Sequence, residues 1–156
     1  MTERPVGIAD TDVYITRAFD APRDLVWRFW TEPELLALWF GPVGVHAPAE
    51  KISVDMRVGG HWNVTMVDDE TGAEYPIRSV LLEVEQPSLF AGRADADTSE
   101  GPLGDVRLRV ELHDHGAKTR VTLHQGPFTA EQRDMTAAGW NDSFIKMDTA
   151  IEGIPA

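Results

Sequence analysis

The last part of the chain carries the clearest pattern of apolar and polar positions, from Thr129 to about Ile151. At about 100° per residue, four large apolar side chains fall on one stripe: Trp140, Phe144, Met147 and Ile151. Thr129 and Gln132 fit a capping box at the start, and Gly153 follows the end. The pattern predicts a long amphipathic helix. Such a helix needs a concave apolar partner, which the rest of the chain must supply.

The first part of the chain predicts a strand followed by two short helices. Residues 12–19 alternate between apolar and polar, and Arg17 interrupts the apolar side, so we expect a sheet edge there. Pro22 favours the first turn of a helix. The segment 31–34 (Thr-Glu-Pro-Glu) fits a second capping box. It predicts another short helix, which ends at Gly41-Pro42.

The middle of the chain, residues 46–125, changes to a period of two, which is typical of strands. The apolar residues within 75–84 share one face only if an extra residue is inserted near Ser79, which we interpret as a β-bulge. Residues 89–94 predict a short strand, and residues 95–104 predict a loop with Gly and Pro. Consecutive strands joined by short loops predict an antiparallel sheet with one polar face.

These elements together predict an α+β fold. The length of 156 residues fits a single domain spanning residues 1–156, with its core at about 12–152. We expect a curved antiparallel sheet of about six to seven strands, wrapped around the long C-terminal helix. The two short helices would follow the first strand.

Several short segments stand in a characteristic order along the chain. They are Phe19-Asp-Ala-Pro22, Leu25-Val26-Trp27, the segment from Thr31 through Pro42, Asp55-Met-Arg57 with Gly59-Gly60, Gly72-Ala-Glu-Tyr75, and Gly139-Trp140. In this order the chain resembles the SRPBCC superfamily (START/Bet v 1-like), which has the helix-grip fold. Within it, the chain is similar to the branch homologous to the C-terminal domain of the Hsp90 ATPase activator. The resemblance implies a cavity between sheet and last helix, and it implies no catalytic set.

We expect a ligand site in that cavity, built mainly from large aromatic side chains and adaptable methionines. The candidates are Trp39, Phe40, Trp62, Val64, Met66, Arg133, Trp140, Phe144 and Met147. Arg133 lies on the apolar stripe of the last helix, where it could meet a carboxylate or phosphate at the cavity mouth. The alternative is that the apolar candidates fill the core and that Arg133 pairs with one of the many acidic residues.

The histidines give no firm site. His113 and His115 stand two apart on a strand and could bind a metal, but the segment 114–116 predicts a turn and no third ligand is near. We therefore predict no metal site, and we predict no cofactor. By alternation, His124 points away from the core with Arg120. It would act as an acid or base only if a bulge turned it into the cavity.

Composition and missing motifs narrow the function classes. Without Cys, disulfides and thiolate sites are excluded. Acidic residues outnumber basic ones by 26 to 14. The resulting negative net charge disfavours binding to nucleic acids and to anionic lipid surfaces. The longest apolar run, Leu35–Phe40, is too short to cross a bilayer, and no signal peptide is visible, so we expect a cytoplasmic protein. The chain lacks the common zinc-protease, hydrolase-elbow, dinucleotide and Walker motifs.

The sequence favours a function in binding a small, mostly apolar ligand between the sheet and the last helix. One alternative is a stress-response protein that contacts an Hsp90-type chaperone, as the resemblance implies, through its acidic surface. Another is a cyclase- or hydrolase-like enzyme using His124 or Arg133 at the same cavity, by analogy with other helix-grip proteins. Whether the protein is an enzyme is left open.

Overall fold

The computed structural model describes residues 9–98 and 101–154, so any structure in the predicted leader lies outside the described residues. Eight strands, three α-helices and a short 3-10 helix follow one another within this part of the chain. In order they are β1 (Val13–Phe19), α1 (Arg23–Thr31), α2 (Pro33–Leu36), β2 (Val45–His46), the 3-10 helix (Ala49–Lys51), β3 (Ile52–Asp55), β4 (His61–Asp68), β5 (Glu74–Glu85), β6 (Leu89–Thr98), β7 (Gly101–His115), β8 (Lys118–Gly126) and α3 (Ala130–Glu152).

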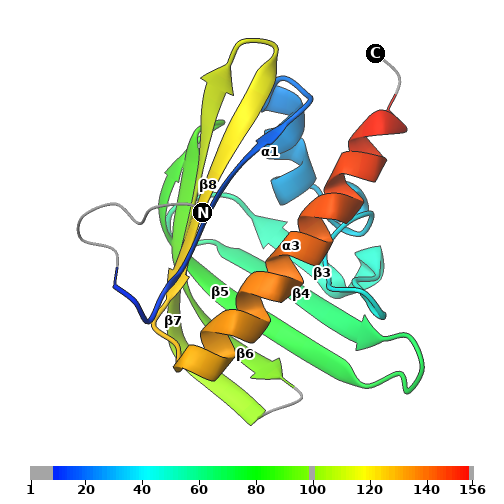
Figure 1. Cartoon of the computed structure of the whole chain (residues 1–156), viewed down its shortest axis with the longest axis vertical. Helices are drawn as coiled ribbons and strands as arrows, with labels where there is room; N and C mark the ends of the chain where they lie inside the picture. Colours follow the sequence, from blue (N-terminus) through cyan, green and yellow to red (C-terminus); the bar gives the residue numbers. More distant parts are fainter. Residues whose placement is uncertain (1–8, 99–100, 155–156) are drawn as a thin grey trace.

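All strands belong to one antiparallel sheet. Its order is β1-β8-β7-β6-β5-β4-β2, with β3 also paired to β4. The sheet curls behind α3, and α1 and α2 lie beside the C-terminal half of that helix (Figure 1). The predicted α+β helix-grip fold is confirmed. The sheet has eight strands rather than six or seven, because β2 is only two residues long and leaves no period-two pattern.

The long helix begins and ends as predicted. The backbone N–H of Gln132 donates to Oγ1 of Thr129 at 3.1 Å, and the backbone N–H of Thr129 donates to Oε1 of Gln132 at 3.0 Å. Gly153 caps the C-terminal end. The buried face of α3 contains Trp140, Ser143, Phe144, Met147 and Ile151. The capping box and the apolar stripe are therefore confirmed.

Arg17 lies on β1, at one end of the strand order, which confirms the predicted sheet edge. Its Nη1 donates to the backbone carbonyl of Phe144 at 2.9 Å, and its Nη2 contacts the carboxylate of Asp148 at 2.6 Å. The side chain also lies over the ring of Phe19, 5.1 Å from its centroid. Arg17 thus attaches the edge strand to the C-terminal half of α3.

The predicted capping box between the two short helices is wrong. Thr31 is the last residue of α1, and its hydroxyl donates to the carbonyl of Trp27 at 3.0 Å. Because Thr31 still belongs to α1, the N-cap position of α2 falls one residue later than predicted. Glu32 stands at the N-cap of α2 without a side-chain hydrogen bond. Similarly, Pro22 is the N-cap of α1 rather than a first-turn residue.

The predicted bulge exists in β5, but at another position. The register shifts after Leu81, and Ser79 and Leu81 are buried while Val80 and Leu82 are exposed. The expectation that Val80 and Leu82 face inward is therefore wrong. Gly92 on β6 explains the shift, because a Cβ there would lie 2.5 Å from the carbonyl oxygen of Val80. Only glycine permits this close approach of the two backbones.

The predicted loop over residues 95–104 is also wrong. β6 continues to Thr98 and β7 starts at Gly101, with Ala96 opposite Leu103. Ladder hydrogen bonds to a neighbouring strand outweigh the low strand preference of this Gly- and Pro-bearing stretch. The longer hairpin extends the concave face, and it carries Ala96 and Leu103 to the site described below.

Most of the space beneath the C-terminal half of α3 is filled by aromatic rings. We call this cluster the aromatic core: Trp30, Trp39, Trp62, Phe90 and Phe144, each at most 1% exposed. The rings of Trp30 and Trp39 meet edge to face, with centroids 4.8 Å apart. Nε1 of Trp39 donates to the carbonyl of Phe29, and Nε1 of Trp62 donates to the carbonyl of Trp30. These bonds allow polar indole groups to be buried at little cost.

Candidate functional site

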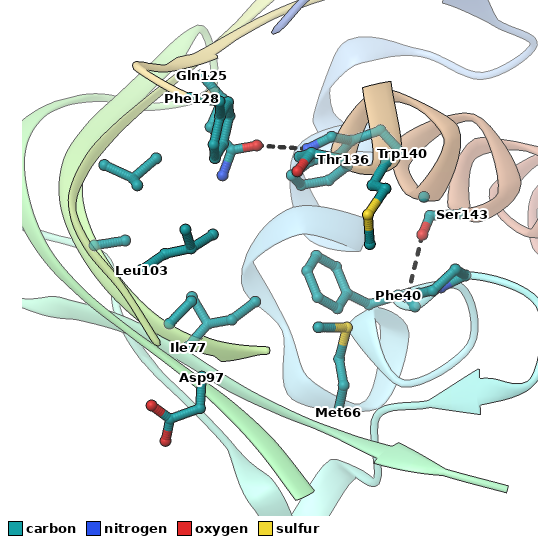
Figure 2. A pocket seen from close by; sticks show the side chains of 17 residues that line it. Phe40, Met66, Ile77, Asp97, Leu103, Gln125, Phe128, Thr136, Trp140 and Ser143 are labelled. Carbon is teal, nitrogen blue, oxygen red and sulfur yellow. Dashed lines mark hydrogen bonds between the residues drawn. The ribbon is translucent and has the colours of Figure 1, made fainter. Parts of the chain in front are cut away.

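A cavity of about 220 Å³ lies between the N-terminal half of α3, the loop after α2 and the concave face of the sheet (Figure 2). Most of its lining residues are apolar. Eleven of them are Phe40, Pro42, Met66, Ile77, Ala94, Ala96, Leu103, Val106, Phe128, Met135 and Trp140, and Gly139 also lines it. The remaining lining residues are Gly41, Asp97, Gln125, Thr136 and Ser143. We call this cavity the pocket.

The pocket exists because small residues face one another across it. Ala94 and Ala96 contribute little volume from β6, and Gly139 and Ser143 contribute little from α3. One residue further along the helix, Phe144 is large and fully packed. Because the residues of α3 and β6 at these positions are small, side chains do not fill the space between them.

Gln125 is the uncharged polar residue on the sheet side of the pocket. Val121 and Leu123 are buried on β8, and the period of two places Gln125 on the same inner face. The indole Nε1 of Trp140 donates to Oε1 of Gln125 at 2.7 Å (Figure 2). The side-chain amide of Gln125 is thereby attached to α3 at the edge of the pocket.

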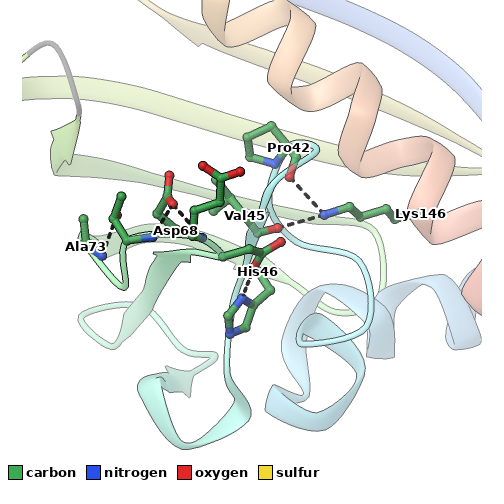
Figure 3. Close-up of polar contacts among 9 residues, drawn as sticks. Pro42, Val45, His46, Asp68, Ala73 and Lys146 are labelled. Carbon is green, nitrogen blue, oxygen red and sulfur yellow. Dashed lines mark hydrogen bonds and ion pairs between the residues drawn. The ribbon is translucent and has the colours of Figure 1, made fainter.

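The loop after α2, residues 41–45, borders the pocket and is fastened to α3; we call it the rim loop. The backbone N–H of Gly41 donates to Oγ of Ser143 at 3.1 Å, and that of Val43 donates to Asp142 at 3.3 Å. Lys146 donates to the carbonyl of Pro42 at 3.0 Å and to that of Val45 at 2.9 Å (Figure 3). Four hydrogen bonds thus join the rim loop to three side chains of α3, two of them donated by Lys146 and two accepted by Ser143 and Asp142.

Partial burial lowers the pKa of Lys146 below its ordinary value, and the nearby charges of Asp69 and Asp142 partly oppose that shift. Asp69 also contacts Nδ1 of His46, at the far end of the rim loop. The ammonium group points at the loop carbonyls (Figure 3), and Lys146 is not in the lining of the pocket. Lys146 therefore acts as a structural donor in this fold.

Asp97 is the one charged residue of the pocket lining. Its carboxylate points away from the cavity in Figure 2, and it lies 4.0 Å from the guanidinium of Arg78. The inner surface of the pocket is accordingly apolar, with the amide of Gln125 and the hydroxyls of Thr136 and Ser143 as its uncharged polar groups.

The structure divides the nine ligand-site candidates into three groups. Phe40, Met66 and Trp140 line the pocket. Five others are packed in the core with at most 1% exposure: Trp39, Trp62, Val64, Phe144 and Met147. Arg133 bonds to the carboxylate of Asp134 and to the backbone carbonyl of Asp10 and is not in the pocket lining. These five side chains are packed in the core, and the aromatic core leaves no space for a ligand beside them.

The histidine candidates lie elsewhere. Nε2 of His124 contacts a carboxylate oxygen of Asp12 at 2.6 Å, and its ring meets that of Tyr14 edge-on, on the face of the sheet away from α3. His113 lies 3.8 Å from Glu111. Among residues 9–98 and 101–154, no group of three or more acidic or histidine side chains could hold a metal ion.

Sequence reasoning missed several residues of the pocket lining. Gln125 follows the inward positions Val121 and Leu123 by strict alternation, so its place on the inner face could have been inferred. Leu103 was missed because it was assigned to a loop. Phe128 precedes the N-cap of α3 and carries no periodic signal at all.

The chain matches a known family. A family model described as "Activator of Hsp90 ATPase homolog 1-like protein" matches residues 20–152. No curated protein matches the chain. Within the part of the chain that the structure describes, no helix is long and apolar enough to cross a membrane.

Several solved structures share the fold. A protein from Nitrosomonas europaea is 26% identical with a TM-score of 0.75, and the match covers 92% of this chain and 96% of that chain. An AHSA1 protein from Silicibacter pomeroyi is 20% identical with a TM-score of 0.77, covering 90% and 97%. A protein from Arthrobacter aurescens is 22% identical with a TM-score of 0.76, covering 94% and 88%. The helix-grip architecture is thus common to chains of similar length.

Proposed function

The chain belongs to the family of activator of Hsp90 ATPase homolog 1-like proteins within the SRPBCC superfamily, and we propose that it binds a small, mostly apolar molecule in the pocket. The pocket between α3 and the sheet is the single observation that carries this proposal. Well-packed cores rarely leave voids much larger than a water molecule. A cavity of about 220 Å³, which could hold about seven waters at ~30 Å³ each, is far larger than such voids.

The size and lining of the pocket limit the ligand. Ligand sites usually fall between about 300 and 1,000 Å³, so this pocket fits a molecule smaller than a typical drug. One aromatic ring with a short substituent is a reasonable match, since an apolar cavity of about 150 Å³ can bind benzene. Binding would remove apolar ligand surface from water and place it against Phe40, Met66 and Trp140.

A pair of matched substitutions tests the proposal. Met66→Glu places a charge in the pocket lining, whereas Val80→Glu places the same charge on β5, where the side chain is 55% exposed. Binding of ethylbenzene is measured by NMR titration. We expect Met66→Glu to abolish this binding and Val80→Glu to leave it unchanged. Circular dichroism verifies that both variants fold. Equal binding by wild type and both variants would show that the ligand does not enter the pocket.

The enzyme alternative loses the two residues on which it was based. Neither His124 nor Arg133 is in the pocket lining. His124 lies on the opposite face of the sheet with Asp12, and Arg133 is engaged with Asp134 and the backbone of Asp10. A cyclase- or hydrolase-like reaction in the pocket would have to use other groups.

Contact with an Hsp90-type chaperone stays a prediction that follows from the family. The net charge of −12 is compatible with a basic partner surface. A pull-down at low and at high salt concentration tests it, because an association driven by charge weakens as salt is added. We rank it second, since no contact or surface of the described residues favours it specifically.

A further inference from the structure

We propose that the ligand of the pocket carries an uncharged hydrogen-bond acceptor, such as a ketone, ester or ether oxygen, and that Nε2 of Gln125 selects it. This inference rests on the proposed function, because it names the ligand class of the same pocket. It follows from the way in which Trp140 fixes the orientation of the Gln125 amide.

Trp140 decides which end of the amide remains free. An indole N–H can only donate, so its partner at 2.7 Å must be the carbonyl oxygen of Gln125. A flipped amide would place two donors against each other and is excluded on that ground. Trp140 is itself held tightly: it is 7% exposed, and its ring lies 5.6 Å from that of Phe40 and 5.7 Å from that of Trp30. The amide therefore has a fixed direction.

The free end of the amide is a donor directed at the pocket. Figure 2 shows the nitrogen of Gln125 on the cavity side, opposite the bond to Trp140. No hydrogen bond links this nitrogen to another residue of the described chain. Nε2 of Gln125 is not one of the buried side-chain atoms that lack a partner, so water can reach it while the pocket is empty. A ligand that displaces this water leaves the N–H unpaired, at a cost in free energy, unless the ligand itself supplies an acceptor there. The pocket thus presents a donor to the ligand from its sheet side.

The charges around the pocket exclude an anionic acceptor. Its lining contains no Lys, Arg or His. Its one charged residue is Asp97, whose carboxylate points outward. A ligand carboxylate would lose its hydration and gain no cation, which costs more than one amide donor returns. The hydroxyl of Thr136, one helical turn before Trp140, can donate or accept and tolerates either arrangement.

The first part of the test compares three ligands of similar size on the wild-type protein. Acetophenone has a ketone oxygen, ethylbenzene replaces it with hydrogens, and benzoate is charged. NMR titration should show that acetophenone binds about two- to tenfold more tightly than ethylbenzene, the range that one net hydrogen bond supplies. Benzoate should bind at least about tenfold more weakly than acetophenone. The side-chain NH2 resonances of Gln125 should shift with acetophenone far more than with ethylbenzene.

The second part changes the donor alone. In Gln125→Glu, one carboxylate oxygen still accepts from Trp140 while the other replaces the donor. The preference for acetophenone over ethylbenzene should disappear. Gln86→Glu makes the same chemical change at an exposed turn between β5 and β6 and should keep the wild-type preference. If Gln125→Glu does not fold, Gln125→Met, which removes the donor without a charge, serves the same purpose.

The outcomes separate the two proposals. If acetophenone and ethylbenzene bind the wild-type protein equally, or if benzoate binds best, the inference about Gln125 is wrong while the pocket remains a binding site. The inference is equally wrong if Gln125→Glu keeps the wild-type preference. If none of the three ligands binds, the proposed function and the inference are both overturned.

Discussion

The two halves of α3 pack against the same sheet with opposite results. Near its C-terminal end, Phe144, Met147 and Ile151 reach into the aromatic core and leave no space. In its N-terminal half, Thr136 and Gly139 line the pocket with little side-chain volume, and Ala94 and Ala96 of β6 line it from the sheet. One half of the helix therefore fills the core, and the other half borders the pocket in which we propose that the ligand binds.

This difference indicates that the volume of the side chains, more than their hydrophobicity, determines where the pocket lies. Both regions are apolar, and aromatic rings occur in both. The pocket appears where Ala94 and Ala96 on the sheet face small residues on the helix. A large aromatic side chain therefore gives little information about ligand binding unless the residues opposite it are small.

The largest expected effect is a contrast between Phe144→Ala and Met66→Ala. Phe144 is 1% exposed in the aromatic core, so its truncation should lower the free energy of unfolding by about 3–5 kcal/mol. Met66 borders a space that is already empty, so its truncation should cost less than about 2 kcal/mol. Urea denaturation measures both values. Equal losses would mean that both ends of the helix are packed alike.

Enlarging one alanine of the core and one of the pocket lining should give the next largest difference. Ala47 is 1% exposed in the core, and Ala47→Leu should cost about 1–3 kcal/mol through overpacking. Ala96→Leu projects into the pocket and should change the stability by less than about 1 kcal/mol while weakening the binding of ethylbenzene. A large loss of stability in Ala96→Leu would contradict the presence of free volume there.

A smaller effect is expected at Gly139, in the open half of the helix. A Cβ there would meet the Cβ of Pro42 at 3.9 Å, an ordinary contact, so alanine fits. Gly139→Ala should stabilise the protein by about 0.5–1 kcal/mol, because alanine has the higher helix propensity. Gly60→Ala is the counterexample, since its Cβ would lie 2.1 Å from the carbonyl oxygen of Asp55, and it should destabilise. Thermal unfolding ranks the two variants.

The smallest effect concerns the rim loop and its pH dependence. Burial lowers the pKa of Lys146 below its ordinary value of 10.5, so just below that pH the unfolded chain holds the proton more tightly than the folded one. The free energy of unfolding contributed by this group should rise with pH across that window. Lys146→Met should remove the rise, and Lys118→Met, at the exposed first residue of β8, should keep it. Denaturation at several alkaline pH values measures the slopes.

Much of the fold was readable from the sequence because its signals are local. The capping box of Thr129 and the apolar stripe of α3 each lie within one helix and were predicted correctly. The position of the bulge was not, because it depends on Gly92 of a neighbouring strand and on how closely two backbones approach. The β6–β7 hairpin was missed for a related reason: its pairing outweighs the composition of its residues.

The pocket lining was predicted only in part, since it depends on what is opposite each residue. Phe40, Met66 and Trp140 were selected because their side chains are large and were expected to face the cavity. The same criteria also selected Trp62, whose side chain is buried in the core. Conversely, Ala96 gives no signal on its own. The inward position of Gln125 could have been inferred from the alternation along β8. The orientation of its amide, with Nε2 free to donate, follows only from the hydrogen bond that Trp140 donates to Oε1.

Native mass spectrometry of the protein as purified from cells tests the central claim most directly. We expect the wild-type protein to carry an added mass that disappears on denaturation, and we expect Met66→Glu to lack it while Val80→Glu retains it. The added mass would also give the size class of the ligand. A bare mass for all three proteins, even after incubation with ethylbenzene and acetophenone, would contradict the account of the pocket as a binding site.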